Sequence, residues 1–304
     1  MKIVSYSQLR SFSRCQWQWG ARYLKTIYPK KQSDPLDIGK LVHNALAQFY
    51  GFGEIDWEIL RSEFVGDLRP EVLAESKRVV DAYLKNGKAE FPGKVLAVEF
   101  PFQVKLPFDT ILVAWIDLIA RVNEKLWLWD HKTSGRMTYG ITHPEREQLS
   151  LYSWGLSKLG APIGGFGVNR LTTTKKPTFA RFFDSVYGIN RTPTAPLSTF
   201  GKLSEELSDA DLQARSKSFV ANCKALPPEG ISMVDLTRSF QDDCSYRCDY
   251  KSLCELDLYG RIEDMSKVVA EEFSYSERGD TATYLERYNI AIPEWWLEDD
   301  NTFT

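Results

Sequence analysis

Two short apolar segments separated by a turn constrain the fold of this chain more than any other feature. The first runs over 111–121 and the second over 126–134, with Asn123, Glu124 and Lys125 between them. Both are rich in β-branched and aromatic residues, so together they predict a β-hairpin. The first segment is apolar on both faces, which is typical of an inner strand covered on both sides.

Charged side chains interrupt this apolar hairpin. Asp117 lies inside the first segment, where a buried carboxylate is costly unless a cation or hydrogen-bond donors surround it. Asp130 and Lys132 lie two residues apart near the end of the second segment, and strand alternation places both on one face. We therefore expect the hairpin to bring two carboxylates and one ammonium group together. Considered alone, an Asp-x-Lys pair is more often a structural ion pair.

Such a group suits metal-dependent hydrolysis of a phosphodiester. Two carboxylates offer the oxygen ligands that Mg²⁺ prefers and that Mn²⁺ also accepts. A cation of this kind activates water and offsets the charge of the phosphate. Lys132 would position the attacking water and stabilise the transition state as a compact cation.

The composition is that of an ordinary globular protein. Its 304 residues suffice for one large domain or two smaller ones, and its net charge is -3. No overall basic field favours nucleic acid, so binding would need local patches such as Arg170, Lys175 and Lys176, which otherwise are solvated surface. No signal-peptide pattern and no apolar run of membrane-spanning length occur, so we expect a cytoplasmic protein without a membrane partner.

The segments around the hairpin carry alternating helix and strand patterns. Helices are expected from near Ser5 through Tyr23, over 37–49, within 54–90 and over 144–158. Strands are expected over 95–106, 164–172 and 178–186. A helix between the hairpin and the strand 164–172 permits a parallel crossover, so the order predicts an α/β fold.

Other candidate site residues lie on these predicted elements. His43 lies one turn after Gly39, which should leave open space beside the imidazole, but a lone helical histidine becomes a ligand only near a metal site. Gln148 and Tyr152 lie four residues apart and share a helix face, where ordinary surface is the alternative. Glu99 offers a further carboxylate, although a solvent-facing or edge position explains it better.

The cysteines are unevenly distributed. Cys244, Cys248 and Cys254 lie close together in sequence, and in a cytoplasmic protein this spacing favours metal or cluster ligation over disulfides. Three thiolates need a fourth ligand for a closed site, and Cys15 and Cys223 are the candidates. Considered with its own segment only, Cys15 is a small buried hydrophobe.

Taken in order, these motifs resemble those of the PD-(D/E)XK nuclease superfamily. The matching motifs are Gly39-x-x-x-His43, Trp115-Ile-Asp117, Asp130-His-Lys132 and Gln148-x-x-x-Tyr152. They are most similar to the RecB-like branch that includes iron–sulfur nucleases of the AddB and CRISPR-associated types, which have one cysteine near the N-terminus and three near the C-terminus. Two departures are Ala114 at a usual glycine and one extra residue between Cys244 and Cys248.

The resemblance implies a restriction-endonuclease-like core with a mixed central sheet flanked by helices, a helical N-terminal region and a C-terminal iron–sulfur segment. It implies these roles: a Mg²⁺ or Mn²⁺ site formed by His43, Asp117, Asp130 and the carbonyl of His131, with Lys132, Gln148 and Tyr152 as further active-site residues. It also implies a [4Fe-4S] cluster on Cys15, Cys244, Cys248 and Cys254, which leaves Cys223 to packing.

The expected function is therefore that of a metal-dependent DNA nuclease, an exonuclease acting on DNA ends or single strands. One alternative is a catalytically silent DNA-binding module of a recombination complex, and another is a nuclease stabilised by zinc without an iron–sulfur cluster. We expect a helical region over 1–94, the nuclease core over 95–190, the cysteine region over 191–264 and an acidic tail over 265–304, interlocked as one domain. The tail is a candidate surface for a protein partner.

Overall fold

The computed structural model describes residues 2–30, 33–64, 68–86, 93–106, 108–122, 124–138, 140–161, 163–173, 179–185, 217–227, 231–239, 244 and 248–275. The chain forms two compact units. Unit 1 combines Met1–Gln32, Lys105–Val113 and Ser218–Asn289, and unit 2 combines Ser33–Val104, Ala114–Lys217 and Ile290–Thr304. The four-part division expected from the sequence stays a prediction.

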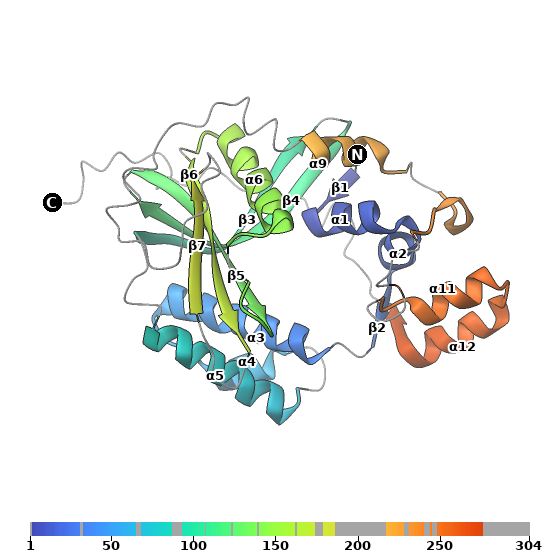
Figure 1. Cartoon of the computed structure of the whole chain (residues 1–304), viewed down its shortest axis with the longest axis horizontal. Coiled ribbons are helices and arrows are strands. Elements are labelled where there is room, and N and C mark those ends of the chain that lie inside the picture. Colours follow the sequence, from blue (N-terminus) through green and yellow to red (C-terminus); the bar gives the residue numbers. More distant parts are fainter. Residues whose placement is uncertain are drawn as a thin grey trace. The chain divides into compact units, whose positions relative to one another are not determined.

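A mixed sheet forms the centre of unit 2 (Figure 1). Its strands are β3 (Lys94–Leu106), β4 (Thr110–Val122), β5 (Lys125–Ser134), β6 (Ile163–Thr172) and β7 (Phe179–Ser185). β3 pairs with β4, β4 and β5 are antiparallel, β5 and β6 are parallel, and β6 and β7 are antiparallel. The predicted hairpin and the parallel crossover are therefore both confirmed, and with them the mixed α/β fold.

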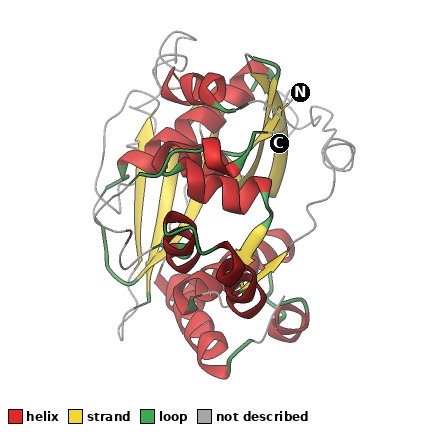
Figure 2. Ribbon diagram, turned by 90° about the vertical axis from the view of Figure 1, so that its right-hand side faces the viewer, coloured by secondary structure: helices red, strands yellow, loops and turns green. Residues whose placement is uncertain are grey.

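Helices cover both faces of the strands β5 and β6. They are α3 (Asp34–Phe52), α4 (Trp57–Ser62), α5 (Pro70–Asn86) and α6 (His143–Lys158). Leu171 of β6 packs into the apolar core formed with α3 and α5, whereas the next residue back, Arg170, contacts Glu145 of α6. Because successive side chains of a strand point to opposite faces, α6 lies on the face opposite α3 and α5. Figure 2 shows the strands in yellow and the flanking helices in red.

The boundaries of the helices that carry site residues have local causes. α6 begins at Thr142 with a capping box, in which Thr142 N donates to the Glu145 carboxylate, and Pro144 occupies its first turn. α3 has a proline in its first turn and ends at Gly53, whose φ of 85° is a conformation that glycine adopts without strain. These signals fix where His43 and Gln148 lie along their helices.

Unit 1 joins segments from both ends of the sequence. Its early elements are β1 (Lys2–Val4), α1 (Tyr6–Arg14), α2 (Gln16–Trp19), the π-helical turn η1 (Gly20–Leu24) and β2 (Ile27–Pro29). Its later elements are α9 (Lys217–Ala225), the 3₁₀ turn η3 (Met233–Asp235), α11 (Lys251–Leu258), α12 (Ile262–Glu272) and β8 (Phe273–Tyr275). β1 runs parallel to the start of β4, and β2 is antiparallel to β8.

The first predicted helix is broken at Cys15. The sequence pattern favours one helix through Tyr23, but Cys15 has an extended backbone with φ -159° and ψ 111°. Its Sγ accepts a hydrogen bond from Gln18 N at 3.5 Å and so caps the second helix, α2. The break sets Cys15 at a junction between two helices.

Several sequence expectations concern residues outside the described ranges. They include Lys175, Lys176, the tail beyond residue 275 and the protein partner proposed for that tail. Within the described part of the chain, no helix combines the length and the apolar character needed to cross a membrane.

Candidate active site

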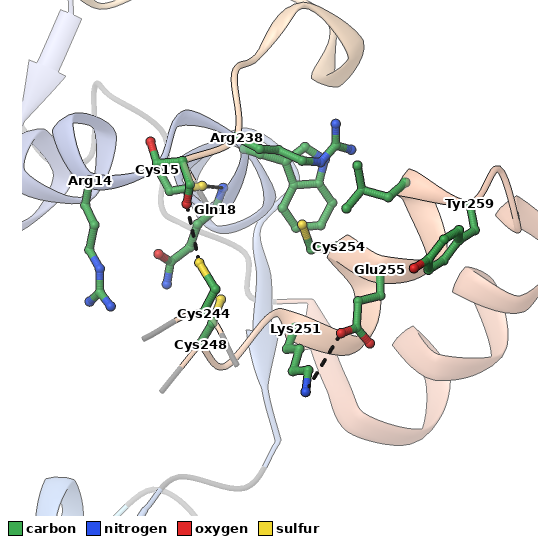
Figure 3. A pocket seen from close by; sticks show the side chains of 13 residues that line it. Arg14, Cys15, Gln18, Arg238, Cys244, Cys248, Lys251, Cys254, Glu255 and Tyr259 are labelled. Atoms are coloured by element: carbon green, nitrogen blue, oxygen red, sulfur yellow. Dashed lines mark hydrogen bonds and ion pairs between the residues drawn. The ribbon is translucent and has the colours of Figure 1, made fainter. Parts of the chain in front are cut away.

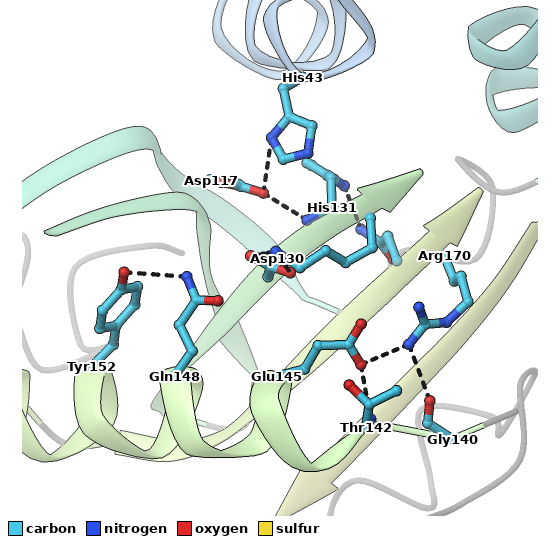
Figure 4. A network of polar contacts seen from close by, with 12 residues as sticks. His43, Asp117, Asp130, His131, Gly140, Thr142, Glu145, Gln148, Tyr152 and Arg170 are labelled. Atoms are coloured by element: carbon cyan, nitrogen blue, oxygen red, sulfur yellow. Dashed lines mark hydrogen bonds and ion pairs between the residues drawn. The ribbon is translucent and has the colours of Figure 1, made fainter. Parts of the chain in front are cut away.

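The centre of the site is the point where strands β4 and β5 separate. Their regular pairing runs from Val122↔Lys125 to Leu118↔Trp129. Immediately beyond it, Asp117 Oδ2 accepts a hydrogen bond of 2.6 Å from the backbone N–H of His131 (Figure 4). A side chain thus accepts from a β5 N–H two residues past Trp129, the last paired residue. This bond fixes the Asp117 carboxylate at the opening between the two strands.

His43 reaches the same carboxylate from helix α3. Its Nδ1 lies 3.3 Å from Asp117 Oδ2, and the two side chains are 27% and 13% exposed. Burial would lower the pKa of His43, but the Asp117 carboxylate beside it raises that pKa to about 9. Burial likewise opposes ionisation of Asp117, yet the charge of His43 and its hydrogen bond hold the pKa of Asp117 below its usual range. The histidine is therefore held against a carboxylate that stays ionised.

Gly39 does not leave the open space that the sequence suggested. A Cβ at this position would lie 3.1 Å from Thr133 Oγ1, a contact tighter than ordinary van der Waals packing. The glycine lets α3 approach β5 closely, and that approach brings His43 within reach of Asp117.

Asp130 and Lys132 form the ion pair that strand alternation predicts. Lys132 Nζ lies 2.8 Å from both carboxylate oxygens of Asp130. The hydrogen bond is to Oδ1, and Oδ2 is a buried oxygen with no hydrogen-bond partner among the described residues. Burial raises the pKa of Asp130 to about 6 although Lys132 opposes the shift. For Lys132, burial is outweighed by Asp130 and Asp117, which raise its pKa and keep it charged.

Glu99 of strand β3 is the site residue that sequence reasoning underrated. It is exposed, as expected, but a carboxylate oxygen of Glu99 lies within 4.8 Å of ligand atoms of His43 and Asp117. Its φ is 46°, in the left-handed region that residues other than glycine avoid, so the alternation of β3 is interrupted there and the side chain is re-aimed. Enclosure by protein atoms, and then the charge of Asp117, raise the pKa of Glu99 to about 7.

His43, Glu99 and Asp117 together fit a divalent cation. Their ligand atoms all lie within 4.8 Å of one another, and two carboxylates with one imidazole suit Mn²⁺ and also Mg²⁺. Asp130 was predicted as a ligand, but it is not a member of this mutual set, and its carboxylate pairs with Lys132. Its role as a ligand stays a prediction, as does that of the His131 carbonyl.

The ring of His131 belongs to the packing behind His43. It stacks on Tyr50 with ring planes 10° apart, and it meets Tyr83 and His43 edge to face. Its Nδ1 lies 3.1 Å from Asn169 Nδ2 of the neighbouring strand β6. These contacts hold the residue whose backbone binds Asp117.

Gln148 and Tyr152 share a face of helix α6, as their spacing predicts, and their active-site role stays a prediction. Gln148 Nε2 donates to the Tyr152 hydroxyl at 3.2 Å, and Figure 4 shows the two on one face of the helix. Tyr152 is buried and packs edge to face on Phe102. Burial, with smaller contributions from Asp130 and Asp117, raises the pKa of Tyr152, so the hydroxyl stays protonated.

Arg170 corrects one of the surface expectations. It was grouped with Lys175 and Lys176 as a basic patch, but it is only 4% exposed. It donates to Glu145 at 2.7 Å and to the Gly140 carbonyl at 3.2 Å. Burial opposes ionisation of Glu145, but the bond from Arg170 lowers the pKa of Glu145, so this carboxylate stays ionised. Arg170 thus connects helix α6 and the loop before it to strand β6. In the sheet register, the backbone of Arg170 lies opposite that of Lys132 in β5.

Comparison with known families agrees with this geometry. The family model of the PD-(D/E)XK nuclease superfamily matches residues 3–255. The chain belongs to the PD-(D/E)XK nuclease superfamily. A solved structure from Eubacterium rectale, described as a putative exonuclease, superposes with a TM-score of 0.50 at 13% identity and covers 81% of this chain and 88% of its own. At that identity the match shows the fold alone.

Two other comparisons add little to the PD-(D/E)XK assignment. A solved structure described as SSO0001 has a TM-score of 0.36 and 14% identity, covering 83% of this chain and 85% of its own, and carries no argument here. No curated protein sequence matches the chain significantly. The residues of this PD-(D/E)XK chain are therefore interpreted from its own geometry.

A second group of candidate residues lines a cavity of about 320 Å³ in unit 1 of this PD-(D/E)XK protein (Figure 3). All four cysteines predicted as cluster ligands line it: Cys15, Cys244, Cys248 and Cys254. Arg14, Arg238 and Lys251 also line the cavity, against a single carboxylate from Glu255. Cys223 is buried in α9 and is not among the lining residues. The cavity wall thus combines four thiol groups with three cationic side chains, of which Arg238 pairs with Asp257 and Lys251 with Glu255.

Cation binding to this PD-(D/E)XK site is expected to tighten as the pH rises from about 6 to 9. With its pKa raised to about 9, the imidazole of His43 carries a proton below about pH 9, and Glu99, with a pKa of about 7, carries one below about pH 7. Each must release its proton before it can act as a ligand. The apparent Kd for Mn²⁺ should fall with each unit of pH, and calorimetry in two buffers of different ionisation enthalpy counts the released protons. His43→Gln should release about one proton fewer. An unchanged proton count would exclude His43 as a ligand.

Proposed function

We propose that this protein is a metal-dependent deoxyribonuclease that acts as an exonuclease on DNA ends or single strands. The observation that carries the proposal is the convergence of His43, Glu99 and Asp117 beside the Asp130–Lys132 pair. The ligand set and the ammonium group lie together where β4 and β5 separate. They can supply a metal-activated water and positive charge for the phosphate, which phosphodiester hydrolysis requires.

The metal ligands in this proposal are His43, Glu99 and Asp117, with the Asp130 carboxylate completing the set. A divalent cation bound there would lower the pKa of a water and neutralise charge on the phosphate. Membership of the superfamily supports this metal dependence. The hydrogen bond from His131 N–H and the approach of α3 at Gly39 set the position of the ligands before any cation arrives.

Lys132 supplies the positive charge that acts on the reacting groups. Asp130 holds its Nζ at 2.8 Å, so the ammonium is oriented before substrate binds. A compact cation can hold a water by hydrogen bond and then stabilise negative charge as it develops on the phosphate oxygens. Tyr152 stays protonated and can donate to the substrate, with Gln148 fixing its hydroxyl.

The cysteine cavity supports the assignment to the RecB-like iron–sulfur branch. Four thiolates suit a [4Fe-4S] cluster, and all four candidate cysteines line this one cavity. The same four thiolates suit zinc, so a zinc-stabilised nuclease is the alternative for this cavity. Iron and zinc contents of the purified protein decide between them.

A catalytically silent DNA-binding module is the second function considered. Asp117 and Asp130 would not help such a module, because burying carboxylates beside a histidine and a lysine costs desolvation free energy and a binding module performs no catalysis that would use them. The complete set of charged residues in the site therefore favours the enzyme.

Incubation with end-labelled DNA tests the proposal. Linear single-stranded DNA with Mn²⁺ or Mg²⁺ should be shortened from an end, whereas circular single-stranded DNA and samples with chelator should stay intact. Asp117→Asn keeps an oxygen that accepts from His131 N–H but loses the charge, so its cleavage should be abolished. Cleavage of the circle would exclude a strict exonuclease, and no cleavage of any DNA or RNA by the wild type would contradict the nuclease proposal.

A further inference from the structure

An open groove leads away from the metal ligands along helix α3. It has a volume of about 560 Å³ and is bounded by the end of α3 and the start of strand β3. The lining residues are Ala47, Gln48, Tyr50, Gly51, Phe52, Val95, Leu96, Ala97, Val98 and Glu99. Glu99 belongs both to this groove and to the candidate metal centre, so the groove opens directly beside the site of hydrolysis.

The chemistry of the lining suits a nucleobase rather than a phosphate. None of the described lining residues carries a positive charge, and its one carboxylate, Glu99, repels anions. The wall combines apolar side chains, such as Val95 and Leu96, with polar groups, and Gln48 offers an amide whose Oε1 already accepts from Asp56 N at 2.8 Å. A flat, mostly apolar heterocycle with polar edges matches such walls, and the charged backbone does not.

Phe52 offers a stacking surface in this groove. Its side chain is 82% exposed, although it is a large apolar group at the last position of α3. Exposed aromatic rings beside a nucleic-acid path are used to stack unpaired bases, because every base has a π-face.

We propose that this groove is a base-binding subsite for single-stranded nucleic acid, in which the nucleotide next to the scissile phosphate stacks on Phe52. The inference rests on the proposed nuclease function and adds to it a preference for unpaired strands. A phosphate held beside His43 and Lys132 would place its neighbouring base at the Glu99 end of the groove.

Two substitutions separate this subsite from the stability of the fold. Phe52→Ala removes the stacking ring. Gly51→Leu fills the groove instead, and a Cβ at Gly51 meets no atom within 4 Å, while leucine is the better helix former. Phe108→Ala is the matched control, because Phe108 is a 50% exposed phenylalanine that does not line the groove.

The test follows the first cut of a linear single-stranded DNA with Mn²⁺, using substrates that carry one abasic site at successive positions from the end. In the wild type, one position next to the cut should lower kcat/KM by about ten-fold or more, the size of one stacking contact. Phe52→Ala and Gly51→Leu should show that loss on the intact substrate, chiefly as a higher KM, and no further loss at the abasic position.

The outcomes distinguish this inference from the proposed function. If the wild type cleaves, but both groove variants match Phe108→Ala and no abasic position matters, the subsite is wrong and the nuclease stands. If the wild type cleaves nothing, the proposed function fails. The affinity of the protein for intact and abasic oligonucleotides, measured by fluorescence anisotropy, then tests the subsite separately. Equal binding of intact and abasic strands would then overturn it.

Discussion

Lys132→Met is expected to lower kcat by about 10²–10³-fold while the protein still binds Mn²⁺. The reason is that Lys132 lies 2.8 Å from Asp130 but is not part of the group formed by His43, Glu99 and Asp117. Removing one electrostatic stabiliser of a transition state typically has an effect of this size. Methionine keeps most of the length of the side chain, so the change is mainly one of charge.

Measuring single-turnover cleavage and Mn²⁺ affinity on the same sample checks this expectation. Lys105→Met is a suitable control, because Lys105 is an exposed lysine outside the site. Asp130→Asn should show the other pattern, with weaker metal binding as well as slower cleavage. Wild-type rates in Lys132→Met would remove the lysine from the mechanism, and parallel loss of metal would make it a structural partner of Asp130.

Replacing any of the four cavity cysteines by serine is expected to remove iron and to destabilise the protein by about 4 or 5 kcal/mol. Cys15 and Cys254 come from distant parts of the chain and line one cavity, so a cluster joining them closes a loop of more than two hundred residues. A cross-link over such a loop removes much of the freedom of the unfolded chain, by the same reasoning as for a disulfide.

Iron content and urea denaturation of each variant provide the measurement. Cys223→Ala is the control, because Cys223 is buried away from the cavity and should keep its iron with a loss of about 1 kcal/mol from packing. Zinc in place of iron, with the same dependence on all four cysteines, would support the alternative of a zinc-stabilised nuclease. Iron retained by Cys15→Ser and lost by Cys223→Ala would show that the fourth ligand is misassigned.

The catalytic hairpin could be predicted because its information is local. Strand alternation alone placed Asp130 and Lys132 on one face, and an apolar run around Asp117 marked it as a buried carboxylate. Glu99 could not be ranked in the same way. Its place beside Asp117 depends on a left-handed backbone conformation at the residue itself, and no periodic pattern reports that.

Arg170 and Cys15 show two other limits of the sequence. Arg170 lies near the end of an apolar strand and is close in sequence to two lysines, so only the position of Glu145 on another helix reveals that it is buried and paired. Cys15 lies in a segment with helical spacing on both sides, and the break there follows from a cap that its own sulfur provides. Both depend on contacts rather than on patterns.

The composite make-up of unit 1 has a consequence for how the protein is made. Strand β2, at residues 27–29, acquires its partner only when β8, at residues 273–275, has been synthesised. At about 5–20 residues per second, the early segment waits on the order of ten seconds to a minute on the ribosome. Unit 2 draws most of its helices and strands from 33–217 and can fold during that interval. All four thiols of the cysteine cavity are available only after Cys254 has been synthesised, and until β8 is made the first thirty residues stay exposed to chaperones and proteases.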